Sequence, residues 1–213
     1  MGRVQGYGRE RQFSKRLAPP LGYIAAMSGR GRHGAGGTAA FSERQLRDAL
    51  AQFATGVTIV CARGPDGRYV GFTANSFSSV SLDPPLILWT LARESKSLAA
   101  FEAAERYAVN VLSAGQVELA RRFSRPHVDR FANVPIRLGW SDAPLIEGCV
   151  AWLECRHHAR HAAGDHLIFV GEVVTVERAH GLGLVFQHGE FRATVPLSAG
   201  EASKKTGATG SEL

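Results

Sequence analysis

The hydrophobic pattern of residues 41–197 consists of short β-rich runs that end at turn residues. Strong turn signals such as Gly64-Pro65-Asp66-Gly67 separate neighbouring runs and favour hairpins. Strands are predicted at residues 58–63, 69–74, 86–91, 107–112, 149–161, 168–178, 183–187 and 191–195. Because hairpins outnumber β-α-β units in this order, the pattern predicts a mainly β protein with short helices, built as an antiparallel barrel.

The first of three short helices is predicted just before these strands. Ser42 and Gln45 have the spacing of a capping box, which marks a helix start. Leu46 and Phe53 then fall on one face at helical spacing, and the pattern ends near Gly56.

The other two helices are predicted between strands. One covers residues 95–105, and Ser113 and Gln116 form a second capping box at the start of the other. A long loop is expected over residues 126–148.

The formal charge of +6 comes entirely from the first 40 residues. They hold seven Lys and Arg residues and one acid, which leaves 18 of the 25 bases and 18 of the 19 acids for residues 41–213. Because the body is neutral, nucleic-acid binding would have to use the tail, and we expect none. The chain has no apolar run long enough to span a bilayer, so it is expected to be soluble, with no membrane partner.

Residues 1–40 are rich in Gly and Arg and are expected to be a disordered basic tail, and residues 198–213 a flexible end. A transit peptide and an over-extended N-terminus with Met27 as the natural start remain alternatives for the tail. The tail contains a G-x-G-x-x-G match at residues 29–34, but no strand precedes it and no helix pattern follows it. We therefore expect one domain, residues 41–197.

Cysteine and histidine positions give no metal site. The three cysteines have no C-x-x-C spacing, which argues against a disulfide framework and favours a reducing, cytoplasmic setting. His157, His158 and His161 lie together in sequence, but a strand sends the first two to opposite faces and no carboxylate or thiol completes the set. No metal is expected.

Hydroxyl side chains crowd into residues 73–81, between two apolar runs and ahead of Asp83-Pro84-Pro85. In one interpretation this segment is a polar bulge or sheet edge whose hydroxyls bond neighbouring backbone. In the other it is a ligand cradle, because small polar side chains allow a heterocycle or a phosphate to approach closely.

Five separated motifs make the chain resemble the flavin reductase family, in particular the small reductase component of two-component flavin-dependent monooxygenases. The motifs are FATGVTIV (53–60), GFTANSFSSVSLDPPLI (71–87), AVNVL (108–112), GDHLIFVGEV (164–173) and LVFQHGEFR (184–192). The resemblance implies an FMN-binding, Greek-key type split β-barrel that forms a homodimer. It implies an NAD(P)H:flavin oxidoreductase, which passes a hydride from NADH or NADPH to FMN or FAD. The reduced flavin then diffuses to a partner monooxygenase.

The resemblance also implies site residues. Flavin contacts are expected from Ala54, Thr55, Gly56, Val57, Thr58, Thr73, Ala74, Asn75, Ser76, Ser79 and Val80, and phosphate contacts from Ser95, Lys96 and Arg122. Asp165, His166, His188 and Arg192 are expected near the nicotinamide, with His166 as the candidate catalytic residue. Family members commonly carry Tyr where this chain has Phe186 and Phe191, which leaves the nucleotide preference open.

Two other functions remain as alternatives. A flavin-binding electron-transfer or sensing module would use the same barrel without NAD(P)H turnover. A binding protein would use the basic tail on nucleic acid or on an acidic partner.

Overall fold

The computed structural model describes residues 40–126 and 129–196. The expected tail (1–40) and C-terminal end (198–213) therefore fall outside the described residues, except for residue 40. Antiparallel strands dominate the described part, which confirms the mainly β fold with short helices. In residues 40–126 and 129–196, no helix has both the length and the apolar composition needed to cross a membrane.

The strands and helices follow the predicted order closely. The strands are β1 (Thr55–Gly56), β2 (Thr58–Arg63), β3 (Tyr69–Ala74), β4 (Ser78–Leu82), β5 (Pro85–Ala92), β6 (Arg106–Val111), β7 (Ile136–Leu138), β8 (Pro144–Ile146), β9 (Ala151–Ala163), β10 (His166–Arg178), β11 (Leu184–Gln187) and β12 (Glu190–Ala193). The helices are α2 (Glu43–Leu50), α3 (Leu98–Ala103) and α4 (Val117–Ser124), with the 3₁₀ turn η1 (Ala114–Gln116) before α4.

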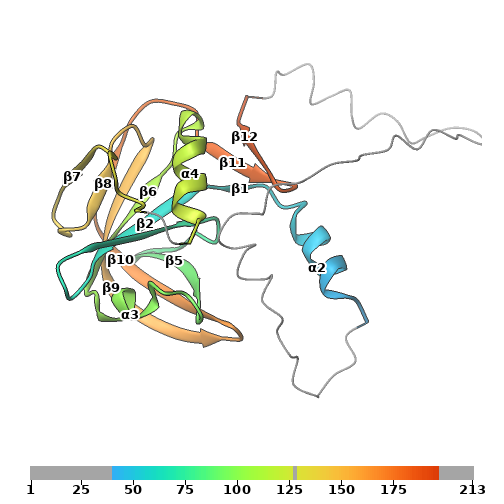
Figure 1. Cartoon of the computed structure of the whole chain (residues 1–213), viewed down its shortest axis with the longest axis horizontal. Coiled ribbons are helices and arrows are strands. Elements are labelled where there is room, and N and C mark those ends of the chain that lie inside the picture. The colour runs from blue at the N-terminus through green and yellow to red at the C-terminus, as the bar shows by residue number, and fades with distance from the viewer. Residues whose placement is uncertain (1–39, 127–128, 197–213) are drawn as a thin grey trace, which may run out of the picture.

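A seven-stranded antiparallel sheet forms the body, in the order β3-β2-β6-β9-β10-β5-β4. Its two edge strands, β3 and β4, are consecutive in sequence. In a flat sheet they would lie about 29 Å apart, because six gaps of about 4.8 Å separate them. The chain from Ala74 to Ser78 spans at most about 14 Å. The sheet must therefore curl until its edges approach each other, which produces the barrel-like body seen in Figure 1.

Aromatic side chains fill the inside of this curled sheet. Trp89 is fully buried and stacks on Phe169, with ring centroids 4.2 Å apart and planes 1° from parallel. Phe101 and Tyr107 meet the same indole edge-on, at 5.1 and 5.3 Å. Alternate residues of β5 are buried, as a strand with one face on the core requires. Because this core is continuous, the strands that carry the site are held rigidly.

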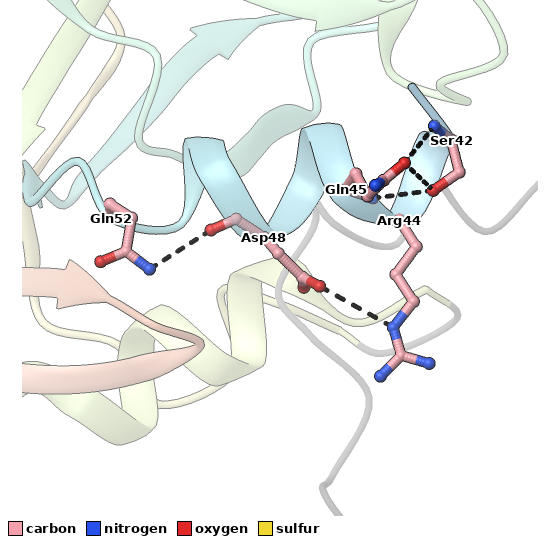
Figure 2. A network of polar contacts seen from close by, with 5 residues as sticks. All are labelled: Ser42, Arg44, Gln45, Asp48 and Gln52. Carbon is pink, nitrogen blue, oxygen red and sulfur yellow. Dashed lines mark hydrogen bonds and ion pairs between the residues drawn. The ribbon is translucent and has the colours of Figure 1, made fainter. Parts of the chain in front are cut away.

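Helix α2 starts as predicted but ends earlier. The Ser42–Gln45 capping box is present, and Figure 2 shows it together with the Arg44–Asp48 ion pair on the same helix. The prediction that the helix continues to near Gly56 is wrong, since it ends at Leu50 and Gly56 lies in β1. Pairing of Thr55 with Phe186 on β11 favours an extended backbone there, and tertiary pairing overrides local helix preference.

The predicted loop at residues 126–148 is also partly wrong, because it contains the β7–β8 hairpin. Glu154 on β9 anchors the connection between these two strands. Its Oε1 accepts hydrogen bonds from the Ser141 amide at 2.6 Å and the Ser141 hydroxyl at 2.8 Å, while Oε2 accepts one from Thr175 at 2.7 Å. Burial alone would raise the pKa of this carboxyl, but the hydrogen bonds from Ser141, Thr175 and the Trp140 backbone lower it. The carboxylate therefore stays ionised and holds the connection in place.

Candidate functional site

A cavity of about 560 Å³ lies beside the edge strand β3 and the end of β5. Its walls come from β3 and Ser76, from the end of β5 and the turn after it, from the end of α4, and from a segment downstream of α4. In residue terms these are 69–74, 76, 90–92, 94–97, 123–124, 126 and 129–131, together with His166. The edge strand β3 and the end of β5, which pairs with the other edge strand β4, both contribute, so the cavity depends on the curl of the sheet.

Most hydroxyls of the polar segment bond backbone. Thr73 Oγ1 donates to the Ala120 carbonyl at 2.7 Å, which ties β3 to α4. Ser76 Oγ accepts from the Thr90 amide at 3.0 Å, which joins the chain after β3 to β5. Ser78 and Ser81 also bond local backbone groups. The sheet-edge interpretation is therefore confirmed for these four hydroxyls, although Thr73, Ala74 and Ser76 also line the cavity.

His166 begins β10 and lines the cavity opposite the hydroxyl segment. It pairs in register with Ala92 at the end of β5, which fixes its backbone. Its Nδ1 lies 2.7 Å from Asp165 Oδ1, and the hydrogen bond to His166 lowers the pKa of the Asp165 carboxyl. A carboxylate at Nδ1 favours the tautomer with the proton on that nitrogen, so the ring has a defined orientation.

The turn after β5 gives the cavity polar and cationic groups. Ser95, Lys96 and Ser97 all line it, and the Ser97 amide donates to Ser95 Oγ at 3.3 Å. An ammonium beside two hydroxyls suits an anionic group such as a phosphate.

Two buried oxygen atoms near the cavity end of the β2–β3 hairpin lack partners. Asn75 Oδ1 and Thr55 Oγ1 have no hydrogen-bond partner within the described residues. Both lie just beyond the Thr58–Ala74 pair that ends this ladder. Because a buried polar group without a partner costs roughly 1–3 kcal/mol, these atoms are suited to a ligand that supplies hydrogen-bond donors. A flavin ring system carries such a donor on its pyrimidine side. Asn75 does not itself line the cavity, but it lies between Ala74 and Ser76, which do.

The remaining predicted residues lie outside the cavity wall. Val57 and Thr58 are buried under it, and Thr58 Oγ1 donates to the Ala74 carbonyl at 2.9 Å. Arg122 donates to the Ala132 carbonyl at 2.7 Å, and Arg192 pairs with Glu190 at 2.8 Å. The other predicted residues that do not line the cavity are Ala54, Thr55, Gly56, Asn75, Ser79, Val80, Asp165 and His188. The cavity thus unites Thr73, Ala74, Ser76, Ser95, Lys96 and His166.

Sequence reasoning missed one wall of the cavity. The rings of Phe123 and Phe131 meet edge-on, with their centroids 5.0 Å apart. The ring centroid of Tyr69 lies 6.0 Å from that of Phe131. Gly71 allows this approach, because a Cβ there would lie 3.0 Å from each of the two phenylalanine rings. Arg130 completes the wall. No local motif marks these residues, since the wall forms only when the segment after α4 folds back onto β3.

The described residues contain no candidate metal-binding site. Within the described parts of the chain, no group of three or more His, Cys, Asp and Glu side chains is arranged to hold a metal ion.

A comparison with protein families assigns the chain to a known group. The family model described as the flavin reductase like domain matches residues 50–194. The chain belongs to the flavin reductase family. The match includes all described residues from 50 to 194, and with them both edge strands of the sheet and every residue that lines the cavity.

Individual relatives agree with this family. A Rhizobium meliloti protein named "Probable flavin reductase" is 45% identical over 162 residues, covering 76% of this chain but 51% of that protein. This chain therefore spans about half the length of that relative. The FMN reductase (NADH) SmoA of Agrobacterium fabrum is 45% identical over 150 residues, which are 70% of this chain and 85% of SmoA.

A solved structure shows the same fold. The Streptomyces globisporus NADH:FAD oxidoreductase SgcE6, in complex with NAD and FAD fragments, matches with a TM-score of 0.70 and 43% identity. The match covers 76% of this chain and 98% of that chain.

Proposed function

We propose that this protein is an NAD(P)H:flavin oxidoreductase that transfers a hydride from NADH or NADPH to FMN or FAD. The observation that carries the proposal is the cavity, which is lined by Thr73, Ala74 and Ser76, by the turn 95–97 and by His166, in a chain of the flavin reductase family. Relatives named as an NADH-dependent FMN reductase and an NADH-dependent FAD reductase support the same chemistry.

The protein's part in this reaction is positioning. When bound, a flavin and a reduced nicotinamide supply the hydride-transfer chemistry between them. Asn75 and Thr55 would bond the flavin, Ser95 and Lys96 would hold its phosphate, and His166, oriented by Asp165, would place the nicotinamide or manage a proton. The apolar wall would exclude water from the stacked rings.

Reduced flavin made in this way would leave for a partner monooxygenase. Relatives include the reductase component of a trigonelline monooxygenase of Acinetobacter baylyi and the reductase subunit HsaB of Mycobacterium tuberculosis. We place this chain in the same role, in the cytoplasm, as a component that supplies diffusible reduced flavin.

The proposal predicts that NADH or NADPH absorbance falls on mixing with the purified protein only when FMN or FAD is added. The reason is that the flavin acts as a substrate that must bind, react and leave. The measurement is the initial rate with each of the four nucleotide and flavin pairs, against a protein-free control. If flavin binds but no pair turns over, the reductase assignment fails and an electron-transfer or sensing module becomes the better account.

Helix α2 supports a homodimer. None of its residues is buried, and its apolar face leaves Leu46 37% and Leu50 49% exposed, while Phe53, just after the helix, is 75% exposed. Figure 1 shows the helix lying apart from the main sheet. A capped amphipathic helix with an uncovered apolar face is typical of an element that packs on another chain, and a second copy of this chain is the occupant we propose.

The double substitution of Leu46 and Leu50 by Arg is expected to convert the dimer to a 22.9 kDa monomer at micromolar concentration. Two charges would have to be buried in the apolar contact, which costs several kcal/mol. Light scattering after gel filtration measures the mass. Asp48→Arg, on the polar face of the same helix, is the matched control and should remain dimeric. A monomeric wild-type protein would refute the proposal directly.

A further inference from the structure

Arg130 is held in a fixed position on the cavity wall. Its Nη1 donates to the Gly71 carbonyl on β3 at 2.6 Å. Its Nε and Nη2 donate to the Arg125 carbonyl at 3.3 and 3.1 Å. Three donors of the planar guanidinium are therefore bonded to two carbonyl oxygens that belong to different parts of the fold, so the side chain has little freedom to turn.

The charge of Arg130 has no acidic partner in the described part of the chain. Both of its acceptors are neutral carbonyls, and none of the ion pairs there includes it. The neighbouring Asp129 accepts from the Phe131 amide at 3.2 Å. Burial lowers the pKa of the Arg130 guanidinium, yet an arginine remains charged at neutral pH. Of its five N–H groups, two are left for a ligand.

The position of Arg130 along the cavity indicates which part of a ligand it meets. Ser76 and Thr90 both line the cavity and are hydrogen-bonded to each other. Gly71, to which Arg130 is bonded, lies five residues before Ser76, or about 16 Å away along the strand. On the opposite wall, Ser95 and Lys96 lie past the end of β5, likewise away from Thr90. The charged side chains of the cavity thus lie away from Ser76. They are the cations of Arg130 and Lys96 and the carboxylates of Glu94 and Asp129.

This asymmetry matches a molecule with a neutral ring at one end and a phosphate at the other. We propose that Arg130 binds the phosphate ester of the flavin and so makes the cavity select FMN and FAD over riboflavin. The inference rests on the proposed function, because it assumes that a flavin occupies the cavity. A planar, pre-positioned fork of N–H groups suits phosphate oxygens better than a flexible ammonium does.

The test compares the binding of riboflavin, FMN and FAD to the full-length protein by quenching of flavin fluorescence, without any nicotinamide nucleotide. Arg130→Gln is expected to raise the Kd for FMN and FAD at least tenfold, which corresponds to about 1.4 kcal/mol. The Kd for riboflavin should change less than twofold. Arg130→Lys keeps the charge but loses the fork, and should fall between wild type and Arg130→Gln.

Two results would overturn the inference. Equal weakening of all three flavins would show that Arg130 only supports the wall. Unchanged FMN binding with a raised KM for NADH or NADPH would assign the same phosphate chemistry to the nicotinamide nucleotide instead. If Arg130→Gln does not fold, Arg130→Lys carries the test, with a several-fold weaker FMN complex and unchanged riboflavin binding expected. Because binding is measured without turnover, a wild-type protein that binds FMN but does not oxidise NADH refutes the reductase proposal and leaves this comparison intact.

Discussion

Replacing His166 with alanine is expected to lower kcat/KM for flavin-dependent NADH oxidation about 100-fold. His166 lines the cavity, and its ring is oriented by a 2.7 Å contact between Nδ1 and Asp165 Oδ1. Loss of a positioned imidazole that handles a proton or orients the reacting partner typically costs at least this factor. Steady-state rates at saturating flavin, with NADH varied, measure the effect.

The His166 prediction has matched controls. Asp165→Asn keeps the imidazole but weakens its orientation, so about a tenfold loss is expected by the same reasoning. His180→Ala removes an exposed histidine that does not line the cavity, and should leave the rate within twofold. Flavin binding to each variant, read from fluorescence quenching, separates a rate effect from a loss of the site. A His166→Ala enzyme with wild-type kcat/KM would remove this residue from the reaction.

Gly171→Ala is expected to destabilise the protein by about 3 kcal/mol, the upper end of ordinary overpacking effects. A Cβ at this position on β10 would lie 1.8 Å from Tyr107 Oη and 2.6 Å from Tyr107 Cζ. Tyr107 is 2% exposed and packs edge-on against Trp89, so its ring cannot move aside without opening the core. Urea unfolding followed by tryptophan fluorescence gives the change in the free energy of unfolding.

Two further variants test the cause of this destabilisation. Gly115→Ala is the matched control, because a Cβ there meets no heavy atom within 4 Å, and its free energy of unfolding should change by less than about 0.5 kcal/mol. Adding Tyr107→Phe to Gly171→Ala removes the closest atom and should recover part of the loss, which a double-mutant cycle measures. A neutral Gly171→Ala variant would show that the strand and ring are not packed this tightly.

The strands and capping boxes were predictable because their signals are local. The β2–β3 hairpin follows from a turn sequence whose Gly67 has a positive φ of 78°, and the Ser42–Gln45 and Ser113–Gln116 boxes each need only four residues. The end of α2 was not predictable in the same way. It depends on the pairing of Thr55 with Phe186, which lie far apart in sequence.

The resemblance carried by the five motifs located much of the site. It named Thr73, Ala74, Ser76, Ser95, Lys96 and His166, all of which line the cavity. Their roles toward a flavin and a nicotinamide remain predictions. Arg130 lay within a predicted loop and had no motif, although it lines the same cavity.

The sequence by itself therefore determined most of the antiparallel strands, the two capping boxes and the family, because each depends on residues close together in the chain or on motifs in order. Only the tertiary structure decided how the sheet curls, where the cavity opens and which residues close it. The contact between Arg130 and Gly71 joins positions 59 residues apart, and the one between Ser76 and Thr90 joins the connection between β3 and β4 to β5. Such contacts form only when the whole sheet has folded, so no local pattern specifies them.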